Sequence, residues 1–139
     1  MKTFLFALSL IVLLGASALE TSAQERYSVS DFSDFTQSIG EHIIDPIEEP
    51  FVVKSLGGQI LSSGLPMEGV LIEVQGPNGN RKIKGTRTDE KGEFRFHHLK
   101  PGRYRFKTTL DNWQSRVGTI IVSKKAKSAP ILIPIRPGT

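Results

Sequence analysis

The sequence predicts an all-β fold, a seven-stranded antiparallel Greek-key sandwich that follows an N-terminal apolar segment and a short leader. Short runs of residues alternate between apolar and polar side chains, as strands with one buried face do. Glycine, proline and asparagine separate these runs at the positions that tight turns require. Several short strands at this spacing are typical of a sandwich or a barrel.

The first 23 residues have the composition of a secretory signal peptide. Lys2 gives a positive start, an apolar run extends from Phe4 to Leu14, and small residues follow. We expect cleavage after residue 18, at the Ala-Ser-Ala site, or after residue 23, at a weaker second site. The apolar run is shorter than the roughly 20 residues that a permanent membrane span needs. The protein is therefore expected to be exported, either to the periplasm or out of the cell.

Residues 24–50 form an acidic leader, with seven Asp or Glu against Arg26 alone. Ser30 is a suitable N-cap, and an apolar stripe follows it at helical spacing. The stripe consists of Phe32, Phe35, Ile39 and Ile43. The following "DPIEEP" ends any helix, because each proline restricts the residue before it. The segment fits either a linker or a short helix over 31–43 that docks on the domain or on a partner.

Residues 51–139 form a basic domain, with sixteen Lys or Arg against six Asp or Glu. The chain's net charge of +4 therefore combines an acidic leader with a strongly basic domain, which favours anionic partners. Cysteine is absent, which excludes a disulfide framework, a lipid-anchored cysteine and thiolate zinc sites. An exported domain without disulfides is more typical of a bacterial envelope or secreted protein than of a small eukaryotic extracellular domain.

Seven strands are expected in the basic domain, at about residues 56–62, 69–76, 80–88, 93–98, 102–110, 116–123 and 130–136. Alternation is clearest in the second, fourth and fifth of them. We expect these side chains to face inward: Val70, Ile72, Val74, Phe94, Phe96, Tyr104, Phe106 and Thr108. The outward side chains are then Glu73, Gln75, Arg95, His97, Arg103, Arg105 and Lys107.

Three turns separate these strands. Residues 77–80 contain Asn-Gly, which adopts positive φ at little cost and is a hairpin signal. Residues 89–92 open with Asp and close with Gly, and we expect Asp89 to accept backbone N–H bonds there. Residues 100–103 place proline second and glycine third, as a type II turn requires.

The run "GGQILSSGLPMEGVLIEVQGPNG…TRTDEKGEFRFHHLKPGRYRFKTTLDNW" resembles the carboxypeptidase regulatory-like domain, a transthyretin-like or prealbumin-like β-sandwich. The resemblance covers roughly Val53 to Pro134. The positions that carry it are Gly58, Ile60, Pro66, Gly69, Val70, Thr88, Asp89, Gly92, Phe94, Leu99, Pro101, Gly102 and Tyr104. It implies the fold and an accessory role in an exported protein, while fold alone does not set function.

Three related groups imply chemistry that the sequence does not match. Collagen-adhesin B-type domains form a Lys–Asn isopeptide bond promoted by a buried acid. The position that matches this acid here is Lys107, and no acid replaces it nearby on that strand. Transthyretin-related hydrolases end in Tyr-Arg-Gly-Ser, whereas this chain ends in "IRPGT". Intradiol dioxygenases hold iron with two tyrosines and two histidines, which here would require Tyr27 of the leader beside Tyr104. We therefore expect no enzyme, no cofactor and no metal site.

The candidate binding residues are the outward cations of two neighbouring strands, Arg95, Arg103, Arg105 and Lys107. Like charges on neighbouring strands repel. Three interpretations remain open: solvated cations that protect a sheet edge, a face for the acidic leader, or a site for an anionic partner. Trp113 is a candidate for stacking on a sugar ring, although burial is favoured. His97 and His98 point to opposite faces of a strand and so do not converge on one metal ion.

These observations predict an exported, non-catalytic β-sandwich module with a binding or structural role in the cell envelope or the secreted space. Its expected partner is a protein or an anionic or glycan component of the envelope, and nucleic acid is not expected. The alternative is a carbohydrate-binding module that uses Trp113 and the loops near it, and a transthyretin-related hydrolase ranks third. The sequence leaves the oligomeric state open.

Overall fold

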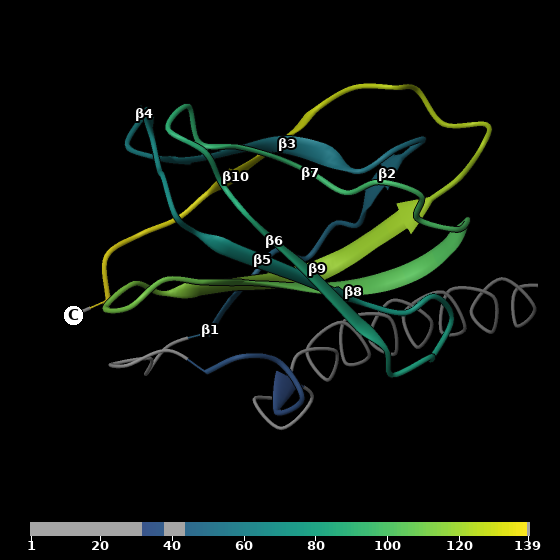
Figure 1. The fold of residues 1–139 in the computed structure, drawn as a ribbon, viewed down its shortest axis with the longest axis horizontal. Helices are drawn as coiled ribbons and strands as arrows, with labels where there is room; N and C mark the ends of the chain where they lie inside the picture. The colour runs from purple at the N-terminus through teal and green to yellow at the C-terminus, as the bar shows by residue number, and fades with distance from the viewer. Residues whose placement is uncertain (1–31, 38–43, 139) are drawn as a thin grey trace, which may run out of the picture.

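A computed structural model describes residues 32–37 and 44–138, and these residues form a sandwich of two β-sheets (Figure 1). The first sheet, sheet A, contains β1 (Ile44–Pro46), β2 (Phe51–Val53), β5 (Leu71–Gln75), β6 (Ile83–Arg87), β8 (Gly102–Thr109) and β9 (Ser115–Val122). The second, sheet B, contains β3 (Gly57–Ser62), β4 (Leu65–Pro66), β7 (Glu93–Arg95) and β10 (Ile131–Pro134). The predicted all-β sandwich is confirmed.

The sheets are mixed rather than purely antiparallel. Sheet A has the order β1-β9-β8-β5-β6, and β2 also pairs with β9. The pairs of β5, β6, β8 and β9 are antiparallel, as expected. However, β1 and β2 pair with β9 in parallel, and β10 pairs with β3 in parallel. The seven expected strands each correspond to an observed one, and β1, β2 and β4 add three short strands that the sequence did not predict.

The space between the sheets holds one hydrophobic core. Ile60, Ile72, Phe106, Ile120 and Ile133 are 0% exposed and belong to the same cluster. Every side chain predicted to face inward is buried. Glu73, Gln75 and Lys107 are buried as well, although they point out of the sandwich, so the outer face of sheet A is itself covered.

Two of the three predicted tight turns form where the sequence placed them. The type II turn predicted at residues 100–103 is wrong, because Gly102 begins β8 with a φ of 147° and the Arg103 N–H donates to the side chain of Asn78. Asn78 and Gly79 have φ values of 55° and 84°, as the predicted Asn-Gly hairpin requires. Gly92 has a φ of 73°, and a Cβ at this position would lie 2.6 Å from the carbonyl oxygen of Ile60. Asp89 accepts the backbone N–H bonds of Lys91 and Glu93, both at 2.9 Å. The structural role expected for Asp89 is therefore confirmed.

The described part of the leader is a turn followed by a strand. The Phe35 N–H donates to the Phe32 carbonyl at 3.2 Å, and residues 33–37 are not α-helical. The remainder of the helix expected over 31–43 lies outside the described residues, as do the predicted signal peptide and its cleavage site. Within residues 32–37 and 44–138, no helix has the length and apolar character to cross a membrane.

Candidate binding surfaces

Four loops meet at one end of the sandwich, on the right of Figure 1. They are residues 54–56, 76–82, 96–101 and 123–130, which connect β2 to β3, β5 to β6, β7 to β8 and β9 to β10. The strand register explains why the loops meet. Each of these strands begins or ends at the same end of the sandwich. The pairs that show it are Val53↔Val122, Gly102↔Val122, Gln75↔Ile83, Gly57↔Arg95 and Ile131↔Gly58.

Every charged residue in these loops is a cation. The loops contain no Asp or Glu, and Arg103 adds a cation at the start of β8. We call this set the cationic loop end, and it consists of Lys54, Arg81, Lys82, Lys100, Arg103, Lys124, Lys125 and Lys127. All eight side chains are exposed, and no carboxylate of the described residues forms an ion pair with any of them.

Hydrogen bonds hold the backbones of these loops against one another. Asn78 donates its N–H to the Arg103 carbonyl at 2.9 Å, and its side-chain oxygen accepts the Arg103 N–H at 3.0 Å. The Tyr104 hydroxyl donates to the Lys100 carbonyl at 2.6 Å, and the Ser123 N–H donates to the Val53 carbonyl at 2.8 Å. The cations therefore lie on loops whose backbones are held by hydrogen bonds.

The opposite end of the sandwich has a different charge. Its loops are residues 63–64, 67–70, 88–92 and 110–114. They contain Glu68, Asp89, Glu90 and Asp111 against Lys91 alone, and Arg136 follows β10 at the same end. The domain is therefore electrically asymmetric along its strands, a feature that the count of charges in the sequence does not reveal.

The four cations predicted as binding residues lie in three different places. Arg103 belongs to the cationic loop end. Arg95 ends β7 and lines a groove of about 620 Å³ on the outer face of sheet B. Arg105 and Lys107 lie farther along β8, on the outer face of sheet A, beneath residues 32–37. The structure therefore does not bring the four together as one site.

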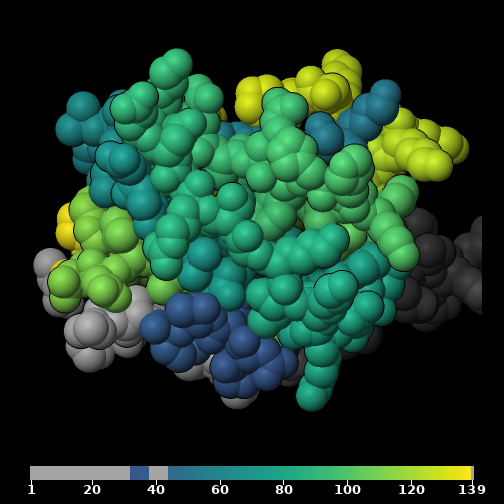
Figure 2. Space-filling model, viewed as in Figure 1, coloured from purple at the N-terminus to yellow at the C-terminus, as the bar shows by residue number. Residues whose placement is uncertain are grey.

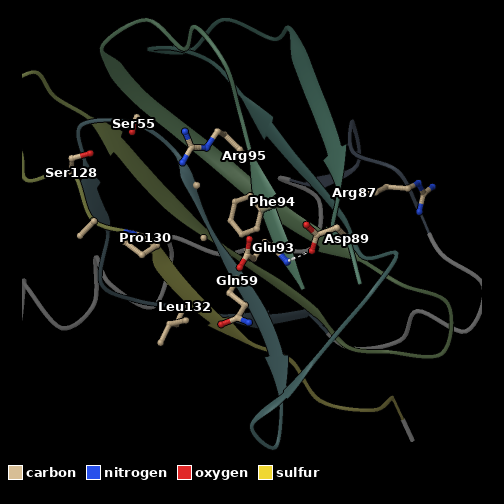
Figure 3. Close-up of a pocket in the computed structure, with 13 residues that line it drawn as sticks. Ser55, Gln59, Arg87, Asp89, Glu93, Phe94, Arg95, Ser128, Pro130 and Leu132 are labelled. Carbon is tan, nitrogen blue, oxygen red and sulfur yellow. Dashed lines mark hydrogen bonds between the residues drawn. The ribbon is translucent and has the colours of Figure 1, made fainter. Parts of the chain in front are cut away.

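The groove beside Arg95 mixes charges of both signs (Figure 3). Arg95 points toward Ser55 in the loop between β2 and β3, and Glu93 lies beside it on the same strand. Gln59 lies between Glu93 and Leu132 in this view and donates to the Lys91 carbonyl at 2.8 Å. Leu132, at the rim, is 58% exposed. The carboxylates of Asp89 and Glu93 lie in the same lining as the two arginines, so the groove is a poorer anion site than the cationic loop end.

Residues 32–37 pack against the outer face of sheet A, where Figure 2 shows them in dark blue against the teal surface of the sandwich. Sequence reasoning missed the residues that contact them from β5, Glu73 and Gln75, because both were expected in solvent. It also missed Arg116 of β9, which forms an ion pair with Asp45 of β1 at 3.6 Å. Burial lowers the pKa of Arg116, while Asp45 opposes that change. Two leader phenylalanines three residues apart were the available signal for a docked segment.

The remaining candidates have structural environments. Trp113 is half-buried, packs against the core cluster and forms a bridge with Pro137. His97 and His98 are exposed, and their rings are 6.3 Å apart. Among the described residues, no group of three or more His, Cys, Asp or Glu is arranged to hold a metal ion.

Comparison with known proteins identifies the family. The carboxypeptidase regulatory-like domain matches residues 55–131, which is more than half of the chain. Among curated proteins, no sequence matches. A solved structure, 3-chlorocatechol 1,2-dioxygenase from Rhodococcus opacus 1CP, shows 14% identity and a TM-score of 0.39, over 75% of this chain and 61% of that chain. A likeness of this size carries no argument about activity. On the match of its sequence, the chain belongs to the carboxypeptidase regulatory-like domain family.

Proposed function

We propose that this protein is an exported, non-catalytic binding module of the cell envelope and that it binds an anionic envelope component through the cationic loop end. The observation that carries the proposal is the convergence of four loops whose eight cations have no acidic residue among them. A surface of one sign raises the local concentration of a ligand of the opposite sign and speeds its association. Family membership supports an accessory role, because carboxypeptidase regulatory-like domains are non-catalytic modules.

The chemistry of the surface favours an extended polyanion over a small ligand. Six of the eight side chains are lysines, which act as flexible point charges and recognise many phosphate or carboxylate geometries. The loops project from an end of the sandwich (Figure 1). An envelope surface of anionic lipid headgroups or an acidic polysaccharide offers many such charges at once.

The carbohydrate-binding alternative has less support. It requires the Trp113 ring to be free for stacking on a sugar, whereas Trp113 is half-buried and packs against the core. Trp113 also lies at the end opposite the cationic loop end, between β8 and β9. A hydrolase is supported by no arrangement of the described side chains.

The test is retention of the full chain on two anionic surfaces, vesicles that contain phosphatidylglycerol and immobilised alginate. The triple variant Arg103→Glu, Lys124→Glu and Lys125→Glu reverses three charges of the cationic loop end. Because exposed charges are screened within about 10 Å at 0.1 M salt, we expect wild-type binding to weaken at least about tenfold between 0.05 and 0.5 M NaCl. The triple variant should lose binding even at 0.05 M.

The control reverses two cations at the opposite end, Lys91→Glu and Arg136→Glu, and so changes the net charge by −4 where the triple variant changes it by −6. Equal losses in the control and in the triple variant would show that net charge alone governs binding, and would contradict the proposed site. Retention by vesicles only, or by alginate only, would identify which kind of polyanion the surface prefers. Binding to neither surface would refute the proposal.

A further inference from the structure

The outer face of sheet A shares no residue with the cationic loop end. It is covered in part by residues 32–37, which we call the docked segment. The contacts involve side chains from three strands, β5, β6 and β8, together with Val117 of β9. Different side chains of the face contact the apolar groups and the polar groups of the segment, so the face is not simply an apolar patch.

Two phenylalanines supply the apolar contact. Phe32 and Phe35 are 2% and 3% exposed, and their ring centroids are 5.6 Å apart. They form a cluster with Val117, against which Ile44 and Ile83 pack. This cluster is separate from the core between the sheets. Burying each phenylalanine contributes about 1.5–3 kcal/mol, so the two rings are a sufficient anchor for a short segment.

Arg105 recognises the aromatic character of the two rings. Its guanidinium carbon lies 5.4 Å from the Phe32 centroid and 5.9 Å from the Phe35 centroid, within the range of a cation–π contact. Arg105 also donates to the side-chain oxygen of Gln75. The Gln75 amide nitrogen in turn donates to the Asp34 carboxylate at 3.3 Å. One network therefore joins both rings and the acid between them to the face.

Glu73 and Lys107 recognise the polar groups of Thr36. The Glu73 carboxylate accepts the Thr36 N–H at 3.0 Å and the Thr36 hydroxyl at 3.1 Å. The Lys107 ammonium donates to the Thr36 carbonyl at 2.7 Å. Glu73 and Lys107 face each other across the β5–β8 pair and are 8% and 0% exposed. Buried charges are stable only when paired or hydrogen-bonded, so these bonds matter to both partners.

We propose that the outer face of sheet A is a peptide-binding site specific for the sequence Phe-x-Asp-Phe-Thr, which the docked segment fills within its own chain. The occupant is this segment, and the same sequence supplied on another molecule, including a second copy of the chain, binds once the chain's own segment is displaced. Sequence specificity comes from the two rings, the Asp34 carboxylate and the Thr36 hydroxyl, while the backbone N–H and carbonyl of Thr36 fix the position of the segment. The proposal stands independently of the anion-binding function.

The test uses the full chain with Phe32→Ala and Phe35→Ala, which removes both anchoring rings and leaves the site empty; we call it the vacated variant. A labelled peptide with the sequence of residues 30–37 is then added. We expect saturable binding to the vacated variant and at least about tenfold weaker binding to the wild type, where the tethered segment competes at high effective concentration. A control peptide with both phenylalanines replaced by alanine should not bind. Adding Arg105→Gln to the vacated variant should weaken binding of the native peptide.

Equal binding of the native and control peptides, or no binding to a vacated variant with the circular dichroism of the folded sandwich, would overturn the proposal. A second measurement covers the case in which the vacated variant does not fold. Arg105→Gln alone should accelerate amide hydrogen exchange at Phe35 and Thr36 at least about tenfold while the amides of β8 and β9 keep their protection. Unchanged exchange at Thr36 would count against the site.

Discussion

Arg103, Arg105 and Lys107 alternate along one strand and share one face, yet their environments differ. Arg103 is exposed, Arg105 is half-buried and Lys107 is 0% exposed. The difference arises because β8 runs from the cationic loop end to the region beneath the docked segment. Strand periodicity correctly predicts that the three side chains share a face. It contains no information about which part of that face another segment covers.

Tyr104 has a predictable effect on the pH dependence of stability. Burial raises its pKa above the ordinary value of 10.0, and only the neutral phenol can donate the hydrogen bond to the Lys100 carbonyl. Near pH 10 the unfolded chain therefore releases this proton more readily than the folded chain, so stability falls as the pH rises through that range. Tyr104→Phe should be about 1 kcal/mol less stable at pH 7, because it loses one hydrogen bond.

The measurement is urea unfolding of the wild type and of Tyr104→Phe from pH 7 to pH 11. The difference in unfolding free energy between the two proteins should become smaller above about pH 10, because only the wild type has this phenol and loses stability when it ionises. Lysines titrate equally in both proteins, so the difference isolates Tyr104. A constant gap would contradict the assigned pKa direction.

The element with the clearest sequence signal is the turn between β6 and β7. Asp89 accepts two backbone N–H bonds, and the Gly92 N–H donates to the Asp89 carbonyl at 2.9 Å. Asp89→Ala leaves both side-chain bonds unmade, so we expect a loss of about 1–2 kcal/mol of unfolding free energy. Asp89→Asn should recover part of the loss, because its amide oxygen also accepts N–H bonds.

Thermal denaturation of these variants provides the measurement, with Glu90→Ala as the matched control in the same turn. Glu90 is exposed, and its replacement should change stability by less than about 0.5 kcal/mol. A similar loss in both alanine variants would show that the turn does not depend on the Asp89 side chain.

The elements that the sequence did not predict are β1, β2 and β4. They contain three, three and two residues, too few for alternation to be visible. β1 ends in Pro46 and β2 directly follows Pro50, and prolines usually indicate the end of a strand rather than its presence. Both strands form because β9 offers an unpaired edge, which is a property of the assembled sheet.

At the scale of the whole molecule, the charge asymmetry should lower stability at low salt. Eight cations gathered at one end repel one another, and salt screens that repulsion. We expect the melting temperature to rise by about 2–5 °C between 0.02 and 0.5 M NaCl, the equivalent of less than about 1 kcal/mol for a domain of this size. Differential scanning calorimetry measures the rise.

A variant with Lys124→Gln, Lys125→Gln and Lys127→Gln should show a smaller rise, because three of the repelling charges are gone. A variant with Lys91→Gln at the acidic end is the control, and its rise should match or exceed that of the wild type. Equal rises in the triple variant and in the wild type would mean that the loops do not repel measurably.

The sequence by itself determined the sandwich, its seven main strands, the inward side chains and the turns at residues 77–80 and 89–92. These features depend on local periodicity and on residues with special backbone preferences, which neighbouring positions in the chain reveal. Only the tertiary structure decided that loops distant in sequence form one cationic end, and that Glu73, Gln75 and Lys107 lie beneath the docked segment. The physical reason is that both features depend on which strands pair and on what covers the outer face of a sheet.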